Sequence, residues 1–249
     1  MIKTFIYKNL NEGSIIVAKK ISNLIKKKEK LNQKCVLGLS TGSSPLKTYS
    51  ELIKMHKKEG LSFKNVIVFN LDEFYPMKQN SQFSYHSFMF NKFLKYIDMQ
   101  KKNINIPKGD ISNKEIKNYC KSFEKKIDNL GGIDLQLLGI GTNGHIGFNE
   151  PGSDINSITR KIIISNHSRL ALSKDFKSID NVPKNAITMG VKTILKAKKI
   201  ILIAWGKTKS KIIRKTLKEK TNPLIPASYL QSHRNTLFIL DKGSSSYLQ

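Results

Sequence analysis

The stretch VIVFNL, residues 66–71, decides the fold class, because almost every position in it is apolar. A second stretch, IILIAW at residues 200–205, has the same character. A strand that is apolar on both of its faces is typical of a parallel sheet covered by helices on each side. We therefore expect these two stretches to be central strands of such a sheet.

Short apolar runs of this kind recur along the chain and alternate with longer amphipathic segments. The predicted strands cover residues 3–7, 35–39, 66–71, 133–140, 161–164, 200–205 and 237–240. The predicted helices cover residues 13–28, 45–58, 83–96, 113–130, 192–198 and 208–218. This order predicts an α/β fold: an open, mostly parallel, doubly wound sheet with helices on both faces. No linker or repeat divides it, so residues 1–249 are expected to form a single domain.

The charge of the chain is strongly positive. Lys and Arg number 44 against 18 Asp and Glu, a formal net charge of +26, which raises the hypothesis of nucleic-acid binding. A dedicated nucleic-acid surface clusters its charge, favours arginine and interleaves aromatic residues. Here lysines are spread along the whole chain amid many Ile and Asn residues, the mixture that an AT-rich genome encodes. We expect no nucleic-acid partner, but a preference for anionic small molecules.

The sequence also argues against a membrane or secreted protein. The longest apolar run, residues 200–205, is far shorter than the roughly 20 residues that a membrane helix needs. The amino-terminal segment has no uninterrupted apolar core of a signal peptide. Cys35 and Cys120 are too few for a disulfide scaffold and are expected to be reduced thiols. We therefore expect a cytoplasmic protein.

Ligands of doubly wound sheets bind beyond the carboxyl ends of the strands, so the loops there are the candidate sites. After residues 35–39 come Thr41, Gly42, Ser43 and Ser44, directly before a predicted helix. Small hydroxyl residues and a glycine at a helix amino terminus suit a phosphate group. The alternative is an ordinary helix start capped by Ser or Thr. After residues 200–205, Lys209 opens another helix and is a candidate second phosphate ligand; the alternative is a solvated lysine.

Asp72 and Glu73 follow the strand at residues 66–71 and form an adjacent acidic pair. Burial at this end of a strand would raise the pKa of a carboxyl group and suit it to act as a base. Successive side chains of a strand point in different directions, so we expect one member of the pair to face the site. A pair that only caps a helix or turn is the alternative.

A glycine-rich loop, residues 139–152 (GIGTNGHIGFNEPG), follows the strand predicted at 133–140. It formally matches GxGxxG, but a dinucleotide site also needs a following helix and an acidic residue about 20 positions later, and both are missing. What remains is His145 and Glu150, five residues apart on a loop that allows close approach of a ligand. This spacing suits a pair that transfers protons. A metal site is not expected, because no further His or Cys cluster supports one.

Together these segments resemble the glucosamine-6-phosphate deaminase family. LGLSTGSSP, FNLDEFYP, SYHSFM, LGIGTNGHIGFNEPG, WGKTKS and IPASYLQSH occur in the family's order and spacing, from about residue 36 to residue 240. The resemblance implies a modified Rossmann-like fold, no cofactor, and conversion of glucosamine 6-phosphate and water to fructose 6-phosphate and ammonia. The related 6-phosphogluconolactonases share the fold but lack the FNLDE and FNEP motifs. A lactonase or another sugar-phosphate isomerase is therefore the second hypothesis, and a nucleic-acid-binding protein the third.

The resemblance also implies roles for individual residues. Asp72 would be the base that moves a proton between C2 and C1, and His145 the proton carrier that opens the sugar ring. Asn143 and Glu150 would position His145; some family members have an aspartate where this chain has Asn143, so His145 is expected to depend more on Glu150. Residues 41–44 and Lys209 would bind the phosphate. Lys174, at a position where an arginine is common, would assist them.

The remaining implications concern movement and regulation. Residues 153–182, rich in Ser, Asn and Lys, are expected to form a mobile lid. Longer family members bind a second sugar phosphate at a subunit interface. Ser153 and Arg160 match that pattern, but Ile162 and Ile163 stand where a lysine and a threonine would contact the effector. We therefore expect no allosteric control, while the sequence leaves both a monomer and a homo-oligomer open.

Overall fold

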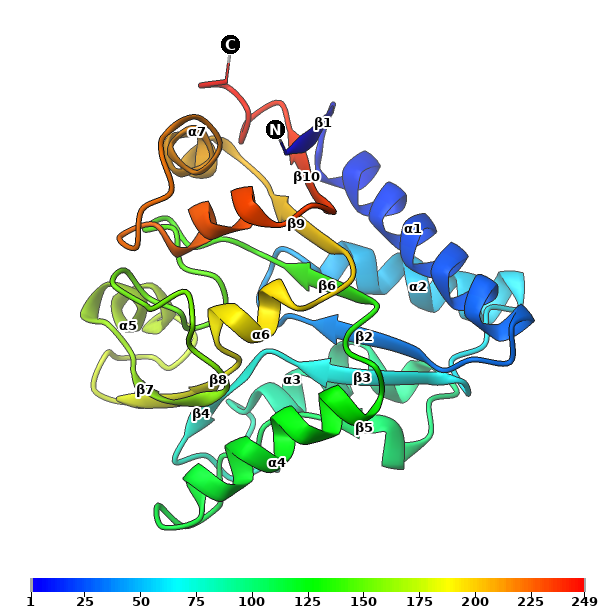
Figure 1. The fold of residues 1–249 in the computed structure, drawn as a ribbon, viewed down its shortest axis with the longest axis horizontal. Helices are drawn as coiled ribbons and strands as arrows, with labels where there is room; N and C mark the ends of the chain where they lie inside the picture. Colours follow the sequence, from blue (N-terminus) through cyan, green and yellow to red (C-terminus); the bar gives the residue numbers. More distant parts are fainter. Residues whose placement is uncertain (1, 249) are drawn as a thin grey trace.

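The computed structural model describes residues 2–248 and is built around a seven-stranded parallel sheet (Figure 1). Its strands lie in the order β1-β10-β9-β6-β2-β3-β5, and every neighbouring pair is parallel. Their bounds are β1 Lys3–Tyr7, β2 Cys35–Leu39, β3 Val66–Asn70, β5 Ile104–Asn105, β6 Leu135–Leu138, β9 Ile200–Ala204 and β10 Thr236–Asp241. All residues of β2, β3, β6 and β9 are buried, as the uniformly apolar runs predicted.

Helices cover both faces of this sheet, which confirms the doubly wound arrangement. On one face pack α1 (Leu10–Lys30), α2 (Leu46–Glu59) and α3 (Tyr85–Lys92). On the other face pack α4 (Ile116–Asn129), α6 (Val191–Leu195) and α7 (Ser210–Lys218). Alternate residues along each strand enter the two cores; in β2, for example, Val36 enters one and Leu37 the other. The period-two geometry of a strand requires this division.

Local signals in the sequence explain where the helices begin and end. Asn9 precedes α1, and its side chain accepts hydrogen bonds from the backbone amides of Asn11 and Glu12. Such capping satisfies amides that have no partner within the helix. At the end of α2, Gly60 adopts a left-handed conformation with φ of 69°, which terminates the helix at little steric cost.

A second, three-stranded antiparallel sheet was not predicted. It has the order β4-β8-β7, with β4 Asp72–Tyr75, β8 Asn185–Thr188 and β7 Arg160–Ile163. The strand predicted at residues 161–164 therefore belongs to this sheet and not to the main one. Strand β4 was missed because it follows Leu71 directly and begins with two acidic residues, which were interpreted as part of the loop after the strand at residues 66–71. Helix α5 (Asn166–Leu172) was also missed, because seven residues are too few to show a helical period.

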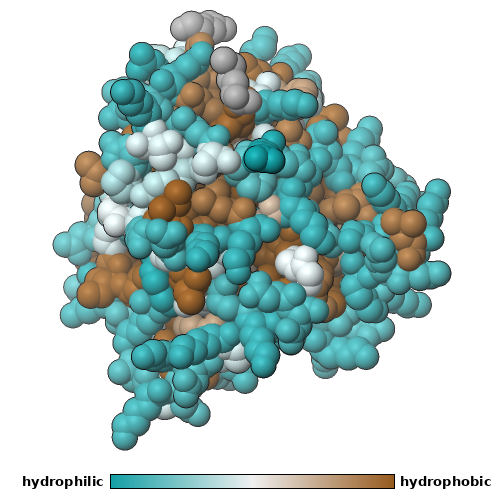
Figure 2. Space-filling view, viewed as in Figure 1, coloured by the Kyte–Doolittle hydropathy of each residue, from teal (hydrophilic) through white to brown (hydrophobic). Residues whose placement is uncertain are grey.

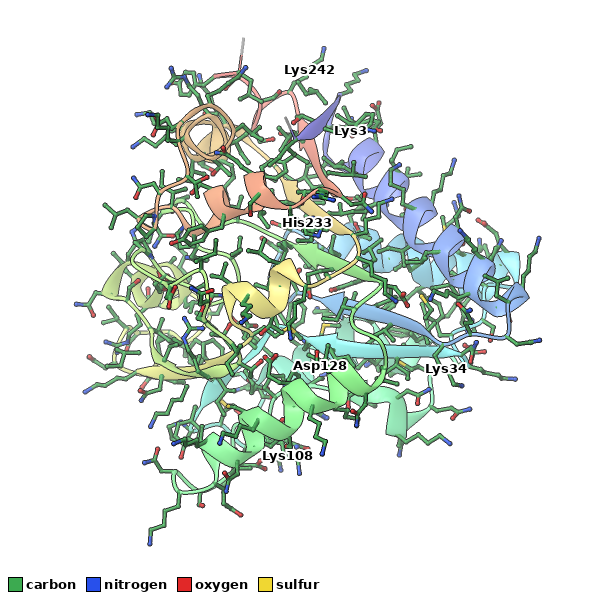
Figure 3. The ribbon with its side chains drawn as sticks, in the orientation of Figure 1. Lys3, Lys34, Lys108, Asp128, His233 and Lys242 are labelled. Carbon is green, nitrogen blue, oxygen red and sulfur yellow. The ribbon has the colours of Figure 1, made fainter. Side chains whose placement is uncertain are left out.

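The positive charge is dispersed over the surface. Figure 3 shows Lys3 and Lys242 near each other at the edge formed by β1 and β10, whereas Lys34 and Lys108 lie on other parts of the periphery; all four are exposed. Figure 2 shows hydrophilic residues over most of one face, interrupted by small apolar patches. Within residues 2–248, no helix is both long enough and apolar enough to cross a membrane.

Candidate active site

A cleft of about 850 Å³ lies at the carboxyl ends of the central strands. Strands β9, β6, β2 and β3 are neighbours in the sheet, so the loops that follow them meet at one edge although they are far apart in the sequence. The predicted site residues that line the cleft are Thr41, Gly42, Ser43, Ser44, Asp72, His145 and Lys209. Asn143 and Glu150 lie directly behind His145, in contact with it or with each other.

The loop of residues 41–44 is fixed at both ends. The Tyr49 hydroxyl donates a hydrogen bond of 2.5 Å to the Ser40 carbonyl, and the Trp205 indole donates one of 3.0 Å to the Ser44 carbonyl. Gly42 has φ of +88°, a conformation that side-chain-bearing residues rarely adopt. Pro45 occupies the position before α2, and no side chain caps this helix. The Ser and Thr hydroxyls of the loop are therefore not used as helix caps, which weakens the alternative interpretation of this segment.

Lys209 lines the cleft and contacts the glycine-rich loop of residues 139–152. Its Nζ donates a hydrogen bond of 2.8 Å to the carbonyl of Ile140, at the start of the glycine-rich loop. Burial lowers the pKa of Lys209. Lys207, two residues earlier in the same 3₁₀ turn, is exposed and does not line the cleft. The turn therefore separates a lysine directed at the site from one directed at solvent.

Asp72 and Glu73 are both buried, at 5% and 1% exposure, but their surroundings differ. Asp72 lines the cleft. Glu73 accepts three hydrogen bonds of 2.9 Å from the backbone amides of Phe74, Tyr85 and His86. Two of these amides belong to the first turn of α3, so Glu73 anchors that helix to β4.

The two carboxyl groups also differ in what sets their pKa values. Burial, reinforced by the neighbouring charge of Glu73, raises the pKa of Asp72 to about 8. Burial raises the pKa of Glu73 to about 7, against the opposing effect of its three backbone hydrogen bonds. A carboxyl group that faces a cleft and has a pKa near neutrality has the properties of a general base.

His145 lies in the cleft beside a carboxylate. Its Nδ1 is 3.6 Å from Oε2 of Glu150, and the Asn143 side chain donates a hydrogen bond of 2.9 Å to the same oxygen. Burial acts to raise the pKa of Glu150, but the neighbouring polar side chains of His145, Ser168 and Asn143 and the charge of His145 outweigh it, so that the pKa falls to about 2. Glu150 is thus a permanent anion beside the imidazole.

The glycine at position 141 lets this imidazole lie against the backbone. A Cβ atom built on Gly141 would be 2.3 Å from Cε1 of His145, closer than any real contact. Gly141 is therefore required for the packing of the His145 ring against the backbone of the loop.

Several other residues line the cleft that were not predicted to be site residues, although Tyr85 lies in the segment SYHSFM that carries the family resemblance. Ser168 and His167 come from the unpredicted helix α5, and Tyr85 from the first turn of α3. Ser168 Oγ lies 3.3 Å from Nδ1 of His145, and His167 Nε2 lies 2.9 Å from Oγ1 of Thr142. Only a helical spacing of apolar residues could have predicted α5, and seven residues are too few to show such a spacing.

Two further expectations concern Lys174 and metals. Lys174 is exposed in the turn after α5 and is not among the residues that line the cleft, so the structure does not bring it to the loop of residues 41–44. In the described part of the chain, no group of three or more His, Cys, Asp or Glu side chains is arranged to hold a metal ion.

Comparisons with known sequences agree with these features. The profile of the family described as glucosamine-6-phosphate isomerases/6-phosphogluconolactonase matches residues 11–239. A glucosamine-6-phosphate deaminase of Thermoanaerobacter sp. (strain X514) is 42% identical over 232 residues, which are 93% of this chain and 91% of that protein. One of Clostridium botulinum (strain Langeland) is 43% identical over 233 residues, 94% and 95% of the two chains. A glucosamine-6-phosphate deaminase-like protein of Bacteroides thetaiotaomicron is 46% identical over 247 residues, but the chain spans only 37% of its length.

Solved structures give the same result. The structure of a monomeric glucosamine-6-phosphate deaminase superimposes with a TM-score of 0.94 at 39% identity, covering 98% of this chain and 99% of that one. A 6-phosphogluconolactonase from Leishmania guyanensis superimposes with a TM-score of 0.77 at 22% identity, covering 100% and 99%. The second similarity is one of fold alone.

Proposed function

The chain belongs to the family of glucosamine-6-phosphate isomerases and 6-phosphogluconolactonases, and from this membership we propose that it is a glucosamine-6-phosphate deaminase. It converts glucosamine 6-phosphate and water to fructose 6-phosphate and ammonia. The observation that carries this assignment is the cleft in which Asp72, His145 and the loop of residues 41–44 meet. The reaction needs a base, a proton carrier and a phosphate anchor, and the cleft provides one of each.

Binding begins at the phosphate. The backbone amides and hydroxyls of residues 41–44 and the ammonium group of Lys209 bind the phosphate oxygens, which places the sugar over Asp72 and His145. Binding energy gained at this remote end orients the reacting carbons.

The two proton-transfer residues then act in turn. His145 takes the proton of the C1 hydroxyl and returns it to the ring oxygen, which opens the ring to the aldehyde. Asp72 removes the proton from C2 and delivers it to C1, while O1 takes up a proton that the ammonium group at C2 releases. The aldehyde carbon thereby becomes an alcohol carbon, and an iminium is left at C2. Water adds to C2 and ammonia leaves, giving the ketose. Glu150, held by Asn143, stabilises the positive charge that His145 acquires in the first step.

Residues 153–182 contain α5 and form one wall of the cleft, and we assign to them the role of a lid that opens for the substrate. Lys174 belongs to this segment and, in this proposal, approaches the phosphate when the substrate binds. Hydrogen exchange tests the proposal: addition of fructose 6-phosphate should slow exchange of the α5 amides, while those of α1 stay unchanged. Equal exchange with and without the sugar phosphate would contradict a lid.

A coupled assay of ammonia release from glucosamine 6-phosphate tests the activity itself. A lactonase would instead release acid from 6-phosphogluconolactone without ammonia, and a nucleic-acid-binding protein would do neither. We assign a sugar phosphate as the partner, rather than a nucleic acid or a membrane, and the cytoplasm as the place of action. If no ammonia were released at any of the substrate concentrations tested, the proposal would be overturned.

A further inference from the structure

Ser168 connects helix α5 to the two residues behind the reacting sugar. Its side chain is buried, at 2% exposure, although it belongs to the segment of residues 153–182 that covers the cleft. Its Oγ is 3.3 Å from Nδ1 of His145. Together with His145 and Asn143, it also helps to hold the pKa of Glu150 low. One hydroxyl group thus contacts His145 and acts on the ionisation of Glu150.

The distances indicate what this hydroxyl does. Nδ1 of His145 and Oε2 of Glu150 are 3.6 Å apart, which is an ion-pair separation but too long for a hydrogen bond. The Ser168 hydroxyl is closer to Nδ1, at 3.3 Å, and a hydroxyl can donate one hydrogen bond while it accepts another. Glu150 is ionised and can only accept. The hydroxyl proton therefore belongs on the Glu150 side, and its lone pair faces Nδ1.

We propose that Ser168 is a positioning residue for the deamination, which bridges Glu150 to His145 and holds the imidazole proton on Nδ1. The inference rests on the proposed function for its catalytic consequence. With Nδ1 protonated, Nε2 of His145 carries the free lone pair that takes the proton of the C1 hydroxyl. The tautomer of a histidine is set by the partner of its other nitrogen, and here that partner comes from α5.

The position of Ser168 depends on the rest of the covering segment. Its backbone amide donates a hydrogen bond of 3.1 Å to Oγ of Ser165, which caps α5. The Arg169 guanidinium donates bonds of 2.7 and 3.3 Å to the carbonyls of Ile179 and Val182. Displacement of α5 would therefore withdraw the bridging hydroxyl, so that His145 has its full set of partners only while the cleft is covered.

The test compares two serines of the same helix. Ser168→Ala removes the hydroxyl group. Ser165→Ala removes the cap of α5, but the contacts of Arg169 with Ile179 and Val182 still hold the helix that carries Ser168. We expect Ser168→Ala to lower kcat by about fivefold to twentyfold, as for the loss of one hydrogen bond to a charged pair, with KM changed less than about twofold. Ser168→Thr, which keeps the hydroxyl, should restore kcat to within about threefold of the parent. Ser165→Ala should lower the Tm and leave kcat near that of the parent.

A second measurement does not depend on turnover. The 15N chemical shifts of the His145 ring in the free protein report which nitrogen carries the proton. The parent protein and Ser168→Thr should show Nδ1–H, and Ser168→Ala should show a larger population of Nε2–H. If Ser168→Ala does not fold, Ser168→Cys replaces it, because a thiol of similar size is a weak hydrogen-bonding group.

The outcomes separate the two proposals. An unchanged His145 tautomer in the Ala or Cys variant would overturn the role of Ser168, whatever the activity. So would an equal loss of kcat in Ser165→Ala, which would indicate a structural role of α5. If the parent protein releases no ammonia, the proposed function fails, while the ring shifts still decide whether Ser168 orients His145.

Discussion

The carboxylate of Asp72 lines the cleft, whereas that of Glu73, the next residue, accepts the amides of Tyr85 and His86 at the start of α3. Both are buried, and both have pKa values raised mainly by burial. The pleat of β4 alone gives them separate surroundings. One carboxyl group is left to face a ligand, while the other holds the helix that brings Tyr85 to the cleft.

Replacement of Asp72 by asparagine should abolish most of the activity. The amide keeps the shape but cannot accept a proton, so kcat should fall by roughly 10²–10⁴ with little change in KM. Steady-state ammonia release measures both constants. Glu73→Gln should have a smaller effect on kcat and a larger one on Tm, because it weakens the attachment of α3. The reverse order of the two kcat effects would mean that Glu73 is the base.

The raised pKa of Asp72 also predicts how stability depends on pH. The folded protein holds this proton up to about pH 8, whereas the unfolded chain releases it near the ordinary value of about 4. Between these two pH values the folded state binds more protons than the unfolded state. The contribution of Asp72 to the free energy of unfolding therefore decreases as pH rises. Asp72→Asn should therefore have a higher Tm than the parent at pH 8, and the difference should shrink toward pH 5. A difference independent of pH would show that Asp72 ionises normally.

Lys209 and Lys207 provide a matched pair for testing the phosphate site. Lys209→Ala should weaken substrate binding by about 1–3 kcal/mol through loss of a charge-assisted contact, seen as a higher KM. Lys207→Ala removes the same charge from the exposed side of the turn and should leave KM unchanged. Similar effects from the two variants, both removed by added salt, would indicate general attraction rather than a specific ligand.

The kinetics should be hyperbolic. Ile163, in β7, is 78% exposed, and Ile162 packs against the cluster around Phe74, so neither can donate a hydrogen bond to a sugar phosphate at this edge. Each phosphate or hydroxyl group of an effector that is left without a hydrogen bond costs about 1–3 kcal/mol. This cost removes the difference in effector affinity between two conformations that an allosteric transition requires. Substrate saturation curves with and without N-acetylglucosamine 6-phosphate check this. A sigmoidal curve that the compound makes hyperbolic would contradict the prediction.

Uniform apolarity made the central strands of the main sheet predictable from the sequence, whereas the two-residue edge strand β5 was missed. Buried parallel strands such as β2, β3 and β9 have no polar face, and their runs stand out against the lysine-rich helices. The small sheet lacks this property: β8 has the sequence NAIT, and its existence depends on pairing with β4 and β7. Tertiary contacts, rather than local propensity, create such strands.

The same distinction applies to the cleft. Asp72, His145 and the loop of residues 41–44 follow predictable strands, so their convergence could be inferred from the order of the elements. Ser168 follows β7 of the small sheet rather than a strand of the main sheet, and serine is a common residue type. Its proximity to His145 arises from the path of the chain through β7 and α5, which no local pattern encodes.

The pairing of β1 with β10 has a consequence for synthesis of the chain. In the main sheet, β1 is the edge strand, and β10 is the neighbour that joins it to β9. The ribosome makes β1 before all the other described strands and β10 after them, so β1 can join the sheet only once every other strand has been made. Until then Lys3–Tyr7 has no strand to pair with, and its exposed Phe5 and Ile6 are open to contacts with other nascent chains.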